Sequence, residues 1–242
     1  MEATANPRVL IDVVIPRMGT ESRANRLALD AAIIVGFALF VALCAQLAVK
    51  IPTTTVPITG QTFGVLLTGG ALGSRRGGLS MLVYMVMGMA TMPVFAPSSS
   101  FLGEKSLHVL FPWSGTSGQV FDMSSGGYIV GFALAAFLVG LLAEKGWDRR
   151  SSVPLAMIIG SLAVYAVGLP WLAWFIGSGA TIPGLDLTYY DAIGGSNVLD
   201  KTLKGGLYPF IGGDAVKLLA AALALPGAWA LVDRLKGSRP RG

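Results

Sequence analysis

The sequence predicts an all-α membrane protein with six transmembrane helices and with both termini in the cytoplasm. The 242-residue chain is 53% hydrophobic and only 13% charged, whereas soluble domains carry about 25% charged residues. Its apolar residues gather in six runs, several of which reach the ~20 residues that cross a bilayer. Its basic residues lie mainly in every second segment between these runs, as expected for cytoplasmic segments.

The six runs are expected to be helices, because lipid offers no partner for an open sheet edge. In chain order they are Leu27–Val49, Thr59–Leu72, Leu79–Phe95, Gly126–Leu142, Val153–Ile176 and about Leu207–Val232. The second and third runs are short and rich in glycine, so they must tilt little, thin the bilayer or pack inside the bundle.

The distribution of positive charge predicts the orientation and the domain boundaries. Thirteen basic residues fall in the inner segments and four in the outer ones, and Lys217 inside the last run completes the 18. We therefore expect a cytoplasmic segment over 1–26, a transmembrane domain over 27–236 and a cytoplasmic tail over 237–242. Long outer loops are expected near 96–125 and 177–206.

Two charged residues lie inside the last apolar run, Asp214 and Lys217. An ionisable residue within a membrane helix costs roughly 2.5–3.5 kcal/mol to insert, and such residues usually mark functional sites. The spacing i, i+3 puts both on one helix face, where each charge partly neutralises the other. Asp214 lies roughly 10 Å along the helix from Leu207, which is the depth of a pocket. The alternative is an ion pair that only locks two helices together.

A polar segment between the first two runs supplies further candidate ligand-binding groups. Pro52 and Pro57 end the first helix and keep the linker extended. Thr59 and Gln61 then place a hydroxyl and an amide at the outer mouth of the second run. Gln61 can donate and accept hydrogen bonds, which suits a ligand with amide or ureido groups. Thr59 can also simply cap the helix.

Composition argues against several other classes of protein. The basic residues form no single stripe, so the net charge of +5 does not indicate a nucleic-acid partner. One cysteine and one histidine offer neither an intrachain disulfide nor a metal cluster. The chain lacks the glycine loop and lysine with which ATPases bind phosphate. We therefore expect no enzyme, no metal and no cofactor.

Small residues four apart predict close helix packing. In the first run, Ala28 and Ala32 begin an alanine stripe at the cytoplasmic end, which Ala38 and Ala42 repeat. Such pairs let helix backbones approach closely. The stripe can serve ordinary bundle packing or face a partner protein.

Five blocks together resemble the BioY family, the biotin-specific substrate-binding (S) components of energy-coupling-factor (ECF) vitamin transporters. They are VPITGQTFGVLL, GSRRGGLSMLVYMVMGMATMPVFA, SGGYIVGFALAAFLVGLLAEKGWDRR, YAVGLPWLA and PFIGGDAVKLLAAALALP. They occur in the family's order over roughly Leu27 to Arg234, and the first and last blocks are the most specific.

The resemblance implies high-affinity biotin binding and uptake across the bacterial cytoplasmic (inner) membrane. It implies a ligand site built around Asp214 and Lys217 and a flexible gate matched by Thr53–Gln61. The face with Ala28 and Ala32 would meet the transmembrane coupling protein, which works with two ATPase subunits. Membrane lipid is the surrounding partner, and a homo-oligomer stays open, as does uptake by the chain alone.

The chemistry of biotin agrees with these residues. The ureido group offers two N–H donors and one carbonyl acceptor, and an unpaired polar group in a buried pocket costs about 1–3 kcal/mol. Asp214 can accept from the ureido N–H groups, and Lys217 can donate to the carbonyl. Tyr128 can cover the ring face or sit in the interfacial aromatic belt. Gly127 lets backbone approach the ligand, and Phe95 can line the cavity or only pack.

The chain departs from the family pattern at two places. About thirty residues separate Phe95 from the SGGY block, and a proline and serines follow Ala96 where the family often has a polar residue. The segment 177–206 also looks extended. The residue that binds the ligand carboxylate is therefore not carried over. Two alternatives stay open: another small vitamin-like ligand, and a membrane enzyme that uses Asp214.

Overall fold

The computed structural model describes residues 9–15, 22–49, 54–97, 113–149 and 151–237, and the backbone of 107–108. Thr53, at the start of the expected gate, lies outside these residues. So do most of the insertion after Phe95 and the tail after Gly237.

Helices make up most of the described chain. They are α1 (Leu10–Val14), α2 (Arg23–Gln46), α3 (Gln61–Leu72), α4 (Ser74–Met89), α5 (Gly126–Glu144), α6 (Val153–Gly177), α7 (Tyr189–Ala192), α8 (Val198–Gly206) and α9 (Tyr208–Gly237). A 3-10 turn, η1, covers Val120–Asp122. Three two-residue strands, β1 (Ala48–Val49), β2 (Ile58–Thr59) and β3 (Leu107–His108), pair antiparallel in the order β2-β1-β3.

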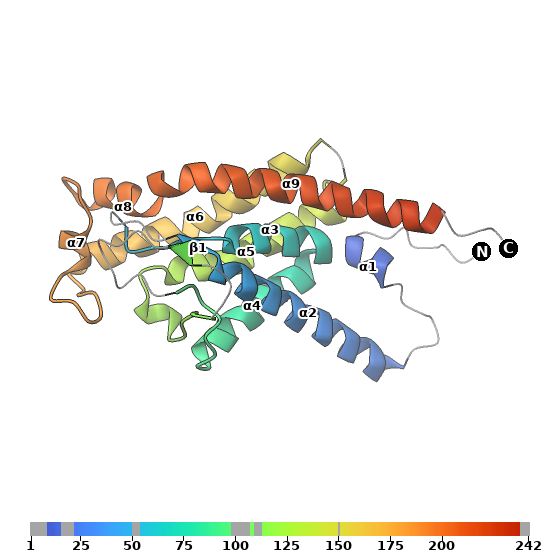
Figure 1. Ribbon diagram of the computed structural model, residues 1–242, viewed down its shortest axis with the longest axis horizontal. Coiled ribbons are helices and arrows are strands. Elements are labelled where there is room, and N and C mark those ends of the chain that lie inside the picture. The colour runs from blue at the N-terminus through green and yellow to red at the C-terminus, as the bar shows by residue number, and fades with distance from the viewer. Residues whose placement is uncertain are drawn as a thin grey trace.

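The long helices lie side by side in an elongated bundle, and α2 begins at the end where α9 finishes (Figure 1). At that end the backbone N–H and hydroxyl of Ser74 both donate to Glu144 Oε1 at 2.8 Å, which joins the start of α4 to the end of α5. At the opposite end the Tyr128 hydroxyl, in the first turn of α5, donates to Gly206 O. The start of α4 and the end of α5 therefore lie at one end of the bundle, and the start of α5 lies at the other, so α4 and α5 run in opposite directions.

Four helical segments within the described chain have the length and apolarity to cross a membrane. They are Arg23–Gln46, Gly126–Glu144, Val153–Gly177 and Val198–Lys236, the last of which includes α8 and most of α9. The predicted class, an all-α membrane protein, is confirmed. The other two predicted spans correspond to α3 and α4. With a rise of 1.5 Å per residue, they are only about 18 and 24 Å long.

The polar segment between α3 and α4 is more helical than the sequence indicates. The sequence places Gly73–Gly78 between two spans, but α4 begins at Ser74 and Gly73 alone makes the turn, with φ +83°. The first turn of α4 is held in place by an ion-pair cluster. There Arg76 binds Asp12 of α1 at 2.8 Å and Asp30 of α2 at 3.0 Å. The turn therefore forms part of a packed junction.

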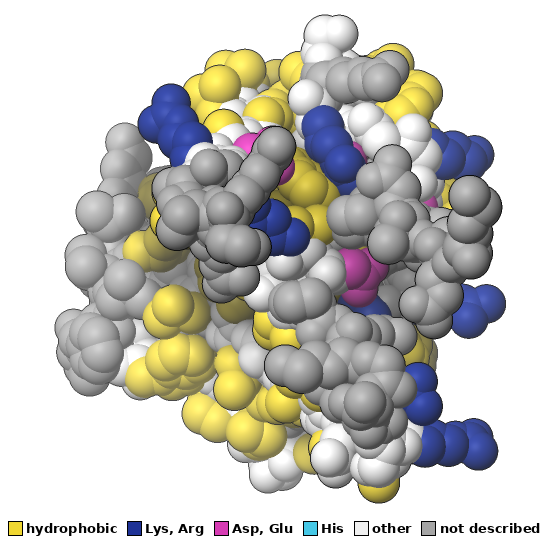
Figure 2. Space-filling model, turned by 90° about the vertical axis from the view of Figure 1, so that its right-hand side faces the viewer, with side chains coloured by type: hydrophobic (Ala, Val, Ile, Leu, Met, Phe, Trp, Pro, Cys, Tyr) yellow, Lys and Arg dark blue, Asp and Glu magenta, His cyan; other side chains and the backbone are white. Residues whose placement is uncertain are grey.

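The end of the molecule where α2 begins and α9 finishes carries many basic side chains, as Figure 2 shows from that end. Arg23 and Arg26 are exposed in the first turn of α2, and Arg234 and Lys236 lie in the last turn of α9. This is the end that the sequence assigns to the cytoplasm. A membrane protein usually keeps such charge on its cytoplasmic side. The opposite end, with α7 and α8, is called the outer end below.

The main core lies between α5, α6 and the outer parts of α2, α3 and α4. The N-terminal half of α2 stands apart from this core. Ala28 and Ala32 are exposed, whereas Ala38 and Ala42 are completely buried. One alanine stripe therefore serves two environments, because only its second half packs inside the bundle.

Candidate functional site

A cavity of about 300 Å³ lies inside the outer half of the bundle. Its volume is at the lower end of the range for small-molecule pockets. It is lined by residues of α3, α5, α6 and α9 and of the connections at the outer end. Six of the seven predicted ligand-binding residues line it, namely Thr59, Gln61, Phe95, Tyr128, Asp214 and Lys217.

The pair Asp214 and Lys217 forms one wall of the cavity. Their side chains make an ion pair and are only 13% and 14% exposed. The Tyr165 hydroxyl of α6 donates to Asp214 Oδ2, and Lys217 Nζ donates to the carbonyl of Thr59 at 3.0 Å. Apart from the ion pair, Asp214 Oδ1 takes no hydrogen bond from the described chain. A carboxylate oxygen in this state can accept a further donor.

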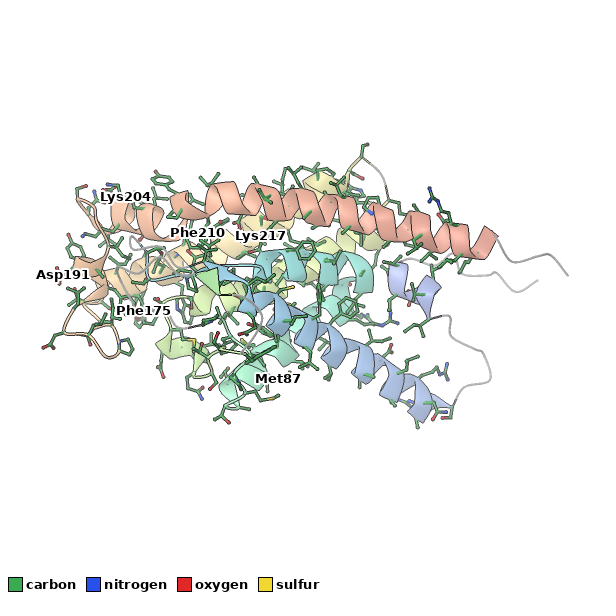
Figure 3. The ribbon with its side chains drawn as sticks, in the orientation of Figure 1. Met87, Phe175, Asp191, Lys204, Phe210 and Lys217 are labelled. Carbon is green, nitrogen blue, oxygen red and sulfur yellow. The ribbon has the colours of Figure 1, made fainter. Side chains whose placement is uncertain are left out.

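The lysine also connects α9 to the start of α3. Figure 3 shows Phe210 and Lys217 on the side of α9 that faces the other helices. The bond from Lys217 to Thr59 joins α9 to β2, so the pair cannot move without the segment that leads into α3. The pair thus both lines the cavity and ties α9 to β2, so its contacts agree with either of the two roles that the sequence leaves open.

Gln61 belongs to a buried hydrogen-bond chain. The Thr59 hydroxyl donates to Gln61 Oε1 at 2.7 Å, and Gln61 Nε2 donates to the Tyr84 hydroxyl at 2.6 Å. Tyr84 in turn donates to the carbonyl of Val94 at 3.1 Å. The Thr59 hydroxyl also accepts from the backbone N–H of Gln61, the first residue of α3, although the N-cap residue of α3 is Gly60 and not Thr59. These bonds orient the amide at the cavity wall.

Aromatic rings form much of the remaining wall. Tyr128 lies nearly parallel to Phe210, with ring centroids 6.5 Å apart, and edge-on to Tyr165 at 6.2 Å. Tyr128 is 7% exposed and its hydroxyl is bonded inside the bundle, so it is part of the core and not of an interfacial belt. Phe95 packs edge-on against Tyr84 with ring centroids 5.5 Å apart. The cavity therefore combines flat apolar faces with a few polar groups.

Two segments cover the cavity at the outer end. The described part of the expected gate, 54–61, contributes Thr55, Val56 and Pro57, and Thr54 donates to the carbonyl of Gly205. The second segment is residues 180–193, which we call the outer cap. It contributes Ile182, Pro183 and Tyr189 to the lining.

Gly127 lies outside the lining residues of the cavity. A Cβ atom at this position would be 2.3 Å from Trp171 Cβ of α6. The glycine therefore allows close packing of α5 on α6 rather than close approach of a ligand. The predicted partner residues Ala28 and Ala32 lie far along α2 from the cavity, on the exposed part of the helix.

Three tyrosines shape the site, and none of them is among the seven ligand-binding residues predicted from the sequence. Tyr165 bonds to Asp214, Tyr84 bonds to Gln61, and Tyr189 lines the cavity from the outer cap. Burial raises the pKa of Tyr189, so its phenol stays neutral. A usable signal was present, because a tyrosine within an apolar helix needs a partner for its hydroxyl. The identity of each partner depends on the packing of helices that are distant in sequence.

The chemistry of the site is that of recognition. It offers a carboxylate acceptor, an ammonium donor, an amide, several hydroxyl groups and aromatic faces. Within the described residues no group of three or more histidine, cysteine or acidic side chains could hold a metal ion. Buried polar groups that face an apolar cavity orient a ligand that can satisfy them.

Comparison with known proteins gives a consistent result. A sequence model of the BioY family matches residues 18–234. A protein from Pyrococcus horikoshii named "Probable biotin transporter BioY" is 33% identical over 204 residues, which cover 83% of this chain and 94% of that protein. The "Biotin transporter BioY" of Thermotoga maritima is 31% identical over 179 residues, or 72% of this chain and 82% of that protein.

A solved structure shares the fold. The crystal structure of the S-component for biotin from an ECF-type ABC transporter aligns with a TM-score of 0.62 and covers 90% of this chain and 96% of that one. The two sequences are 19% identical over the alignment.

Proposed function

The chain belongs to the BioY family, and from this premise we propose that it binds biotin in the cavity and takes part in biotin uptake across the bacterial cytoplasmic membrane. The observation that carries the proposal is the partly buried group formed by Asp214, Lys217 and Tyr165, which lines a cavity of suitable size. The relatives named as biotin transporters support the same ligand.

In the proposed complex, the ureido group of biotin lies against α9. Asp214 accepts from a ureido N–H, and Lys217 donates to the ureido carbonyl. The Gln61 amide, oriented by Thr59 and Tyr84, is a further polar contact. The bicyclic ring packs against Tyr128 and Phe95. The ureido carbonyl and one ureido N–H then have partners, which avoids about 1–3 kcal/mol for each buried group that would otherwise be unpaired.

The proposed transport role includes the finer predictions made from the sequence. The six long helices span the membrane, with the segment 1–26 and the tail 237–242 in the cytoplasm. The exposed face of α2 with Ala28 and Ala32 meets the coupling protein, which works with two ATPase subunits. The chain itself needs no cofactor.

Binding of labelled biotin to the purified protein in detergent tests the proposal, together with Asp214→Asn. The substitution keeps the shape of the side chain but removes the charge that strengthens its hydrogen bonds. Charge-assisted hydrogen bonds contribute roughly 1.5–3 kcal/mol, so we expect affinity to fall about ten- to a hundredfold. Asp233→Asn is the matched control, because Asp233 is exposed near the other end of the same helix. It should bind as the parent does.

Melting temperatures measured on the same preparations separate binding from folding. If Asp214→Asn folds well and keeps the affinity of the parent, the pair is structural and the ligand lies elsewhere. If the parent fails to bind biotin but binds another small vitamin-like compound, the function is that of an S component with a different ligand.

A further inference from the structure

A buried lysine outside the cavity has no use in the binding of biotin described above. Lys201 of α8 is 6% exposed, and it forms no ion pair with any residue in the described chain. Its neighbour on the same helix, Lys204, is half exposed and pairs with Asp200 at 2.8 Å. Burial of an ammonium group without a carboxylate partner costs free energy, which hydrogen bonds to the group must offset. The acceptors of those hydrogen bonds therefore show which segment Lys201 holds in place.

The side chain of Lys201 is bonded to the backbone of the outer cap. The ammonium group donates to the carbonyl of Tyr190 at 2.8 Å and to that of Ile193 at 2.6 Å. It also lies 4.2 Å from the centre of the Tyr190 ring. All three contacts are at the C-terminal end of the cap, where the short helix α7 finishes and leaves carbonyl groups that need donors.

The backbone around Lys201 leaves room for its side chain. Gly195 has φ +154°, and a Cβ atom there would lie 2.8 Å from Lys201 Cγ. A larger residue at this position would therefore strike the lysine stem. Ile193 packs against Gly205 at the end of α8, where a Cβ atom would be 3.0 Å away from its side chain. The cap is thus held on α8 by the hydrogen bonds of Lys201 and by the apolar contact of Ile193 with Gly205.

The cap is one folded unit, so a bond at its C-terminal end acts on the residues over the cavity. The Ile182 N–H donates to Leu187 O at 2.9 Å, and the Tyr189 N–H donates to Ala180 O at 3.0 Å. Ile182 and Tyr189 are both buried and both line the cavity. Figure 3 labels Asp191 and Lys204 at this same outer end of the molecule.

The other side of α8 is fastened to the cavity wall. At its C-terminal end, Gly205 O accepts from Thr54 of the gate, and Gly206 O accepts from Tyr128 at 3.0 Å. The helix is therefore bonded both to the cap and to residues that line or flank the cavity. Whatever holds the cap on α8 also holds it over the cavity.

We propose that Lys201 is a positioning residue that keeps the outer cap closed over the cavity and thereby slows the escape of the ligand. This inference rests on the proposed function for its ligand, but the closure itself is a property of the chain. Removal of the ammonium group frees two backbone carbonyls and lets the cap open more often.

The opening of the cap can be measured without any ligand. Cys44, the one native cysteine, is buried, so a cysteine placed at buried Ile182 reports access to the underside of the cap. The parent carrying only Cys44 gives the background reaction. In the Ile182→Cys protein, Lys201→Met should speed reaction with a maleimide about tenfold or more, because it removes two charge-assisted hydrogen bonds. Lys204→Met is the matched control and should leave the rate unchanged.

The second measurement follows labelled biotin. Lys201→Met without the reporter cysteine should raise the dissociation rate several-fold while the melting temperature and the association rate change little. Lys201→Gln keeps a neutral donor, so its dissociation rate should lie between those of the parent and of Lys201→Met. If Lys201→Met does not fold, Lys201→Gln replaces it in both measurements. Unchanged maleimide reactivity in folded Lys201 variants would overturn the inference. Absence of biotin binding in the parent would instead overturn the proposed function and leave the reactivity test intact.

Discussion

At the scale of single residues, the polar groups of the site are held by partners from other helices. Asp214 faces Lys217 on its own helix and Tyr165 on α6, while Lys217 also donates to the backbone of β2. Each group is therefore oriented by contacts within the protein itself. Preorganised groups lose little entropy when a ligand binds, which favours high affinity.

A second buried carboxylate lies at the opposite end of the bundle. Asp148 is 1% exposed and accepts from Trp229 Nε1 of α9 at 2.7 Å. The Arg149 guanidinium lies 3.6 Å from the centre of the Trp229 ring. Burial raises the pKa of Asp148 above its ordinary value of 3.8, and the bond from Trp229 opposes this only in part.

The raised pKa predicts a pH effect of a definite sign. Between the unfolded and folded pKa values of Asp148, the folded state binds more protons, so this residue contributes less stability as pH rises through that window. The melting temperature of the parent relative to Asp148→Asn should therefore be highest near pH 4 and fall toward neutral pH. A difference between the two proteins that does not change with pH would contradict the assignment.

At the scale of elements, the segment proposed as a gate, residues 54–61, is bonded to the end of α8. The hydroxyl of Thr54, which is 3% exposed, donates to the carbonyl of Gly205, while Val56 and Pro57 cover the cavity. One side-chain bond thus links the connection between α2 and α3 to the C-terminal end of α8.

Replacement of this bond tests the gate. Thr54→Val has nearly the same shape but leaves the Gly205 carbonyl without its donor, and a lost bond of this kind costs about 1 kcal/mol. We expect biotin to dissociate about fivefold faster. Ser22→Ala, which removes an exposed hydroxyl bonded to Asn25 at the start of α2, far from the cavity, is a control for loss of a side-chain hydroxyl. Equal dissociation from parent and Thr54→Val would remove the gate role from this segment.

The alanine stripe of α2 offers a test within one helix. Ala28→Leu or Ala32→Leu enlarges an exposed side chain, whereas Ala38→Leu enlarges a completely buried one. If the exposed half meets the coupling protein, the first two substitutions should lower biotin uptake in cells and leave binding by the purified chain unchanged. Ala38→Leu should lower the melting temperature, since extra volume in a packed core is destabilising. Equal loss of binding and uptake in Ala28→Leu would contradict a partner surface.

At the scale of the whole molecule, the two ends differ in charge and in structure. Basic side chains gather at the end where α2 begins and α9 finishes, as Figure 2 shows. The two segments that cover the cavity, residues 54–61 and the outer cap, lie at the other end. This polarity suits a protein that takes up a ligand on one side and meets its partners on the other.

Cysteine labelling in whole cells tests the orientation. Asp186 in the outer cap and Lys236 at the end of α9 are both exposed, and native Cys44 is buried. A maleimide that cannot cross the membrane should label Asp186→Cys in intact cells, and Lys236→Cys only after the cells are opened. Labelling of both positions in intact cells would contradict the proposed single crossing of the membrane between Asp186 and Lys236.

The fold class, the long helices and six of the residues that line the candidate cavity could be predicted from the sequence. Apolar runs long enough for a bilayer, and charges inside one of them, are signals carried by consecutive residues, so all six long helices and the pair Asp214 and Lys217 were predicted. The boundaries of α4 were less accurate, because the polar turn at Ser74 becomes helical only when Arg76 reaches acidic residues on α1 and α2.

Tertiary structure alone decided which side chains meet. Tyr165 and Asp214 are 49 residues apart, and Thr54 and Gly205 are 151 apart, so no local pattern could pair them. Gly127 was assigned to the ligand because a glycine pair permits close approach, but only packing shows that the approaching group is Trp171. The cause is the same in each case. The chemistry of a side chain limits the kind of partner it can have, but the packing of distant helices decides which residue that partner is.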